Sequence, residues 1–97
     1  MGNKEKSDMK TKKGFTLRTI GREYVLVAEG LEATDFNKMI SMNETAAYLW
    51  QEVEEKDFDA ETLADLLVDA YGVARETAKN DVNALLLTWK RAGIIVD

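Results

Sequence analysis

The sequence predicts an α+β fold in which strands come first and three helices follow. Residues 15–28 are rich in β-branched and aromatic residues that alternate with polar ones, as in half-buried strands. Residues 43–92 instead carry apolar residues at helical spacing. Gly72 and Gly93 follow helical stretches at the place where a left-handed residue commonly ends a helix. A helix, a short turn, a longer helix and an extended end together give a winged helix-turn-helix-like order.

Three strands are expected before the helices. Residues 15–20 and 24–28 should pair as an antiparallel hairpin, because Gly21 tolerates the positive φ that a tight turn requires. A polar connection, residues 30–37, leads to a third short strand at residues 38–42. This strand could lie at the sheet edge, where unpaired N–H and C=O groups accept an incoming extended peptide.

Each helix has a recognisable start or end. Asn43 is expected to cap the first helix and Asp59 the second, which Gly72 ends, and the third runs over residues 75–92. Residues 94–96 should pack or pair with the rest. Helical spacing predicts these inward residues: Ala46, Leu49, Trp50, Val53, Leu63, Leu66, Leu67, Ala70, Ala78, Val82, Leu85 and Trp89, with Leu86 at the margin.

A few apolar residues fall outside these stripes. Leu87 lies nearly opposite Val82 and Leu85 on a helical wheel, and Tyr48 and Val68 are similarly displaced on their helices. Either Met39 or Met42 should also be exposed. Single exposed apolar residues are normal, but a contiguous patch would meet a partner, such as a second copy of the chain.

The composition argues against an enzyme. The chain has no Cys and no His, so it lacks thiolate ligands, a cysteine nucleophile and the commonest general base. We therefore expect no catalysis, no cofactor and no metal site. No apolar run approaches the ~20 residues of a membrane span, and residues 1–13 lack the apolar segment of a signal peptide. These features predict a soluble, cytoplasmic protein with no membrane partner.

Charge is distributed unevenly along the chain. Five lysines and two acids leave residues 1–13 with a net charge of +3, typical of a disordered basic tail, and residues 14–97 would form the single folded domain. Residues 43–72 hold nine acids and one base, and the third helix carries only +2. A DNA-binding face would be basic, so we expect no nucleic-acid partner.

Two stretches resemble the coenzyme PQQ synthesis protein D (PqqD-like) family. The first combines the strand Tyr24-Val25-Leu26-Val27 with residues 39–50, Met-Ile-Ser-Met-Asn-Glu-Thr-Ala-Ala-Tyr-Leu-Trp. The second runs from Tyr71-Gly72-Val73 through Asp81-Val82 and Leu85-Leu86 to Ala92-Gly93-Ile94-Ile95. The likeness covers residues 14–96, and the order and spacing of the motifs make it more specific than any one motif.

The resemblance implies both a fold and a function. The fold would be a three-stranded antiparallel sheet packed on a three-helix bundle. The protein would capture the leader of a ribosomally made precursor peptide and present it to a modifying enzyme, commonly a radical S-adenosylmethionine enzyme. The leader would add as a strand to the third strand and lie against the third helix. The residues implied for peptide binding are Met39, Ile40, Ser41, Met42, Asp81, Val82, Leu85, Leu86, Trp89 and Lys90.

Two other functions stay open on the sequence alone. One is a winged-helix DNA-binding regulator, against which the acidic charge map argues. The other is a structural module that forms a homodimer through residues such as Leu87 and Tyr48.

Overall fold

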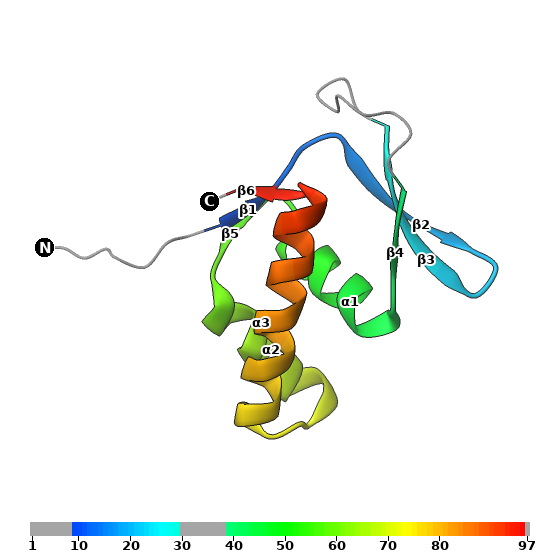
Figure 1. The fold of residues 1–97 in the computed structure, drawn as a ribbon. Coiled ribbons are helices and arrows are strands. Elements are labelled where there is room, and N and C mark those ends of the chain that lie inside the picture. The colour runs from blue at the N-terminus through cyan, green and yellow to red at the C-terminus, as the bar shows by residue number, and fades with distance from the viewer. Residues whose placement is uncertain (1–8, 30–38, 97) are drawn as a thin grey trace, which may run out of the picture.

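The protein is a mixed α+β chain with two three-stranded antiparallel sheets and three helices (Figure 1). The computed structural model describes residues 9–29 and 39–96. The elements are β1 (Met9–Thr11), β2 (Phe15–Ile20), β3 (Glu23–Ala28), β4 (Met39–Met42), α1 (Glu44–Val53), β5 (Asp57–Phe58), α2 (Ala60–Tyr71), α3 (Arg75–Ala92) and β6 (Ile95–Val96).

The larger sheet has the order β2-β3-β4, so the expected three strands are confirmed and β4 lies at an edge. The β2–β3 turn has Gly21 at φ 62°, which suits a two-residue hairpin loop with glycine at its first position. In the β3–β4 register, Met42 pairs with Tyr24 and Ile40 with Leu26. Two parts of the sequence expectation, Lys38 and the connection 30–37, lie outside the described residues.

The smaller sheet, β5-β1-β6, was only partly anticipated. Its β6 fulfils the expectation that residues 94–96 pack or pair. Its central strand, β1, falls inside the segment expected to be a disordered tail, so the folded domain begins before residue 14. Met9 and Thr11 are buried, while Lys10 between them is exposed. The Lys10 Nζ lies 3.6 Å from the Oδ1 of Asp57. Residues 1–8 of the expected tail lie outside the described part of the chain.

Thr11 gives a direct test of whether β1 contributes to the fold. Its side chain is 7% exposed, and its Oγ1 accepts a hydrogen bond from the Glu55 N–H at 3.1 Å. Thr11→Val keeps the shape but leaves that donor without its acceptor, so we expect a loss of about 1–2 kcal/mol in unfolding free energy. Lys12→Ala, at an exposed neighbour, should change it by less than about 0.5 kcal/mol. Urea unfolding measures both, and equal values would exclude β1 from the cooperative fold.

The helix ends follow the local chemistry that the sequence predicts. The Asn43 side chain accepts a hydrogen bond from the Ala46 N–H at 2.8 Å, and Asp59 accepts one from Thr62 at 2.9 Å. Gly72 and Gly93 end α2 and α3 with φ of 68° and 76°. These caps fix where each helix begins and ends, and therefore which faces meet.

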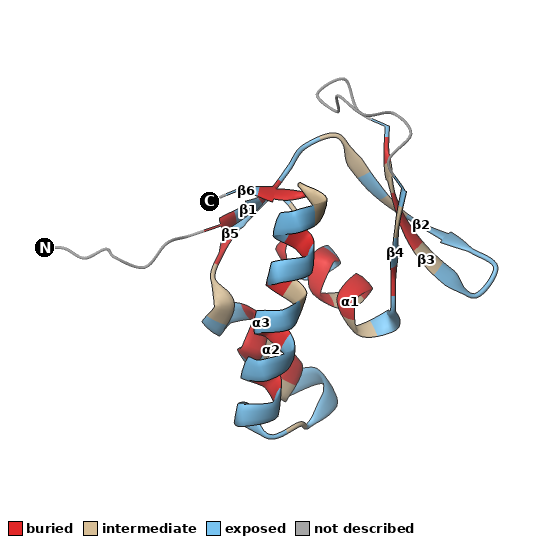
Figure 2. Ribbon diagram, in the orientation of Figure 1, coloured by how far each residue is buried: buried red, intermediate tan, exposed pale blue. Residues whose placement is uncertain are grey.

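The core joins all three helices to both sheets, with the buried faces turned inward (Figure 2). Trp50 and Trp89 pack edge to face at its centre, with ring centroids 5.4 Å apart. Two sequence expectations need correction. Leu86 belongs to the core at 7% exposed whereas Leu85 is half-buried, and Ala70 is exposed. Leu85 and Leu86 differ by one position, so spacing alone did not decide which of them faces inward.

Glu54, just after α1, makes the stability depend on pH. Burial raises the pKa of its carboxyl above the ordinary value, and the negative charge of Glu55 raises it further. The nearby indole N–H of Trp50 lowers this pKa in part, although it does not form a hydrogen bond with the carboxyl. An acid whose pKa rises on folding stabilises the protein when protonated, and that stability is lost as pH rises through the folded-state pKa.

Glu54→Gln should therefore stabilise the protein at pH 7, by less than about 1 kcal/mol. The advantage over the parent should vanish below about pH 4, where both chains are neutral at this position. Thermal unfolding of the two proteins at a series of pH values measures this difference. A constant difference across the series would contradict the assignment.

Candidate peptide-binding groove

A groove of about 420 Å³ lies between α1 and α3. Its apolar surface comes from all three helices and its polar surface from the start of α1 and one side of α3. The lining residues are Ala46, Leu49, Leu67, Ala84 and Leu85 on the apolar side, and Asn43, Thr45, Asp81 and Thr88 on the polar side. We call this the α1–α3 groove.

Side-chain size explains why the groove stays open. Ala46 of α1 and Ala84 of α3 line it with single methyl groups, and Thr45 and Thr88 are also short. Larger residues at these positions would fill the space between two packed helices. On α3, the groove residues 81, 84, 85 and 88 follow the i, i+3, i+4, i+7 spacing of one helix face. The small side chains thus leave one stripe of α3, partly apolar and partly polar, uncovered.

The edge strand β4 is joined to this groove by the residue that follows it. Asn43, the residue after Met42, both caps α1 and lines the groove. On one side β4 pairs with β3, and on the other side no strand among residues 9–29 and 39–96 pairs with it. Alternate residues of an antiparallel edge strand direct their N–H and C=O groups away from the sheet. The free edge of β4 thus offers unpaired backbone hydrogen-bonding groups, and Asn43 joins the end of this strand to the groove.

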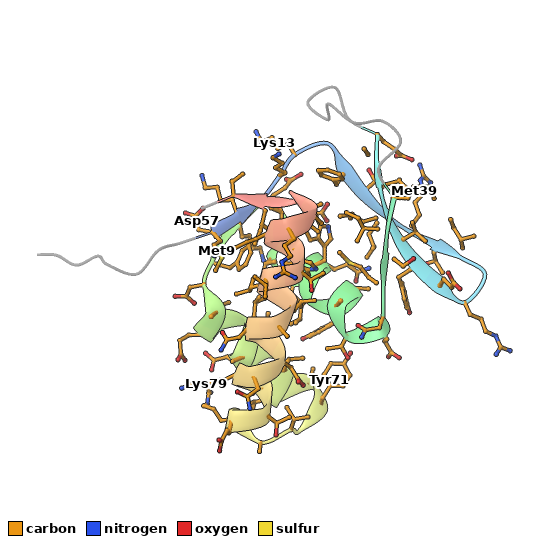
Figure 3. All side chains as sticks on the ribbon, viewed as in Figure 1. Met9, Lys13, Met39, Asp57, Tyr71 and Lys79 are labelled. Carbon is orange, nitrogen blue, oxygen red and sulfur yellow. The ribbon has the colours of Figure 1, made fainter. Side chains whose placement is uncertain are left out.

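The four β4 side chains divide between the two faces of the sheet. Ile40 is half-buried and Met42 is buried, and both share the helix-facing side with the fully buried Leu26. Met39 and Ser41 point to the opposite face and are exposed, Met39 by 62% (Figure 3). Of the two methionines, Met39 is therefore the exposed one.

The six candidates on α3 do not act as one surface. Asp81 and Leu85 line the groove. Val82, Leu86 and Trp89 are buried in the core at 1%, 7% and 1% exposed, so they support the groove wall from behind. Lys90 is exposed on the last turn and is not among the lining residues.

Sequence reasoning missed several groove residues: Asn43, Thr45, Ala46, Leu49, Leu67, Ala84 and Thr88. The sequence already explained Asn43 as a helix cap, and it explained Leu49 and Leu67 as core residues, so nothing marked them as groove residues. Ala84 and Thr88 could have been found, because they share a helix face with Asp81 and Leu85. The α1 and α2 residues carry no such signal, since their part in the groove depends on how the helices pack.

Two of the four basic side chains of α3 form ion pairs with acids of α2. Arg75 forms ion pairs with Asp65 and Glu61 of α2, which raise the pKa of its guanidinium above the ordinary value. Lys79 lies 3.9 Å from the same Glu61. In contrast, the exposed Asp81 makes no ion pair within the described part of the chain. The groove side of α3 therefore presents an acid, not a base.

Neither a metal cluster nor a membrane span occurs in the described ranges. Over residues 9–29 and 39–96, no three Asp or Glu side chains gather closely enough to hold a metal ion. No helix there combines the length and the apolar character needed to cross a bilayer.

Comparison with known proteins identifies relatives of both sequence and fold. The profile of the family described as coenzyme PQQ synthesis protein D (PqqD) matches residues 23–95. Among curated proteins there is no significant match.

Two solved structures share the fold. The first is "Lasso peptide synthetase B1 complexed with the leader peptide", 20% identical with a TM-score of 0.70, covering 94% of this chain and 100% of that one. The second is "TbiB1 in Complex with the TbiA(beta) Leader Peptide", also 20% identical, with a TM-score of 0.68 and coverage of 89% and 93%.

Proposed function

Because the chain belongs to the coenzyme PQQ synthesis protein D family, we propose that it is a recognition element for the leader of a ribosomally synthesised precursor peptide. The observation that carries this proposal is the edge of β4, which has no second partner strand among the described residues and leads into the α1–α3 groove. The two solved structures reported above are described as complexes with leader peptides, which supports the same role here.

The binding mode follows from these two features. An extended leader segment adds to β4 as a fourth strand, hydrogen-bonded to the backbone of Met39, Ile40, Ser41 and Met42. Main-chain bonds give affinity to any extended peptide, so selectivity comes from side chains entering the groove. Leu85 offers an apolar contact there and Asp81 a negative charge. Val82, Leu86 and Trp89 keep the groove wall rigid, and Lys90 lies beyond the lining residues.

The role of such an element is delivery and not chemistry. The bound leader holds the remainder of the precursor within reach of a separate modifying enzyme, which raises the effective concentration of the substrate. A radical S-adenosylmethionine enzyme is the partner that the family resemblance suggests, and the cytoplasm is the expected location. No cofactor is required for this role.

Titration of the ¹⁵N-labelled chain with synthetic leader peptides tests the proposal. Suitable peptides come from short precursors encoded beside this gene, each with a scrambled control of equal composition. A true leader should shift the amide signals of residues 38–42 and 78–90, and its scrambled form should not. If no candidate leader moves either segment, the proposal is wrong.

The winged helix-turn-helix label and the homodimer remain predictions. The order α2, turn, α3 fits the label, but a DNA-binding role would need a basic α3, whose Arg75 and Lys79 already face acids of α2. For a dimer, Leu87 is the natural contact because it is 51% exposed. Light scattering of the parent chain and of Leu87→Asp separates a dimer from a monomer.

A further inference from the structure

All three tyrosines of the chain meet at one hollow outside the α1–α3 groove. Tyr24 comes from β3, Tyr48 from α1 and Tyr71 from the end of α2, and a space of about 230 Å³ lies among them and Glu44, Ala47 and Gln51. The rings of Tyr48 and Tyr71 pack edge to face with centroids 5.8 Å apart. Tyr71 is 42% exposed and projects from the end of α2 toward α1 (Figure 3). We call this site the tyrosine hollow.

The tyrosine hollow and the groove lie on opposite sides of α1. The groove uses Thr45, Ala46 and Leu49, and the hollow uses residues 44, 47, 48 and 51. At about 100° per residue, the centres of these two sets lie nearly opposite each other on the helix. A peptide bound in the groove therefore leaves the hollow uncovered, and the two sites can be occupied at once.

The hollow is both aromatic and negatively charged. Glu44 lines it, and burial together with the charges of Glu52 and Asp69 raises the pKa of the Tyr48 hydroxyl above its ordinary value. Glu44 and Glu52 make no ion pair among residues 9–29 and 39–96. The ring faces attract cations and the carboxylates add to that attraction, while acidic partners are repelled.

We propose that the tyrosine hollow is a second docking surface, which takes an arginine- or lysine-bearing segment of the enzyme that modifies the bound peptide. This inference rests on the proposed function, since it supplies the second contact that a delivery protein needs. Tyrosines dominate the binding energy of many protein interfaces because they are large, rigid and amphipathic. A guanidinium stacks on such rings better than an ammonium does, so arginine is the preferred occupant.

The test uses N-acetyl-arginine amide as a probe of the ¹⁵N-labelled full chain, with uncharged N-acetyl-norleucine amide as its control. The arginine probe should shift the signals of Tyr48, Gln51 and Tyr71 at least about threefold more than norleucine does. Added salt should weaken this response. Equal responses to the two probes, or arginine shifts confined to the groove residues, would overturn the proposal.

Variants at exposed positions separate the hollow from general surface effects. Tyr71→Ala should abolish most of the arginine response, Tyr71→Phe should retain it because the ring face remains, and Leu87→Ala should leave it unchanged. A Tyr71→Ala chain that still responds fully would contradict the assignment. So would a Tyr71-dependent dimer in light scattering, since a second copy would then be the occupant.

A leader titration on the same samples keeps the two proposals distinct. Failure of every leader to move residues 38–42 and 78–90 refutes the proposed function. Leader binding without an arginine response at the hollow refutes only the second docking surface. If the Tyr71→Ala chain still binds the leader but no longer responds to the arginine probe, both proposals are supported.

Discussion

Leu85→Asp should weaken leader binding by about 100-fold, or about 2.8 kcal/mol, without unfolding the protein. Leu85 is half-buried and lines the groove, so an aspartate there removes an apolar contact and sets a second negative charge near Asp81. An apolar leader side chain would then have to lie against a solvated carboxylate. Fluorescence anisotropy with a labelled leader peptide measures the change in affinity.

Leu87→Asp is the matched control for this change. It makes the same substitution on the same helix, two residues away, at a side chain that is 51% exposed and absent from the groove lining. Leader affinity should change by less than about twofold, well under 1 kcal/mol. If both variants lose affinity equally, the leader does not bind in the α1–α3 groove.

Trp89→Ala should lower the unfolding free energy by about 3–5 kcal/mol, the usual cost of removing a large buried aromatic side chain. Trp89 is 1% exposed and packs edge to face on Trp50, which is fully buried. Each kcal/mol shifts the melting temperature of a domain this small by about 4–8 °C, so a fall of about 12–40 °C is expected. Thermal unfolding followed by circular dichroism measures it.

Trp89→Phe distinguishes a core role from a peptide-contact role for this residue. The smaller ring keeps an aromatic neighbour for Trp50, so the stability loss should be clearly smaller than for alanine. Leader affinity at a temperature where the variant is fully folded should stay within about twofold of the parent. A large loss of affinity in a folded Trp89→Phe chain would instead make Trp89 a contact residue.

The elements that the sequence predicted are those with local signals. Asn43 and Asp59 are caps that can be read from the residue type, and Gly72 and Gly93 end helices for a conformational reason. Strand β1 was missed because its two buried residues, Met9 and Thr11, stand among lysines and pair with segments far away in the sequence. Such pairing depends on the whole fold and leaves almost no trace in a three-residue window.

The candidate site was predictable in outline and not in detail. The edge position of β4 was expected from the long connection before it, and Asp81 and Leu85 do line the groove. On α3, the groove residues 81, 84, 85 and 88 and the core residues 78, 82, 86 and 89 lie on neighbouring helix faces. Both sets have helical spacing and they differ by a shift of about one residue, so the spacing did not predict which set faces the core. The groove itself arises from small residues, Ala46 and Ala84, whose shared location appears only once the helices are packed.

The pairing of β1 with β5 and β6 also bears on how the chain is made. Lys10 and Val96 are ladder partners, so β1 cannot complete its sheet until residues near position 96 have left the ribosome. Contacts between such distant segments slow folding, because a long loop must close before they contribute. Stalling synthesis at residue 90 should therefore leave Met9 accessible to oxidation on the nascent chain, whereas a released chain that contains residues 95 and 96 should protect it.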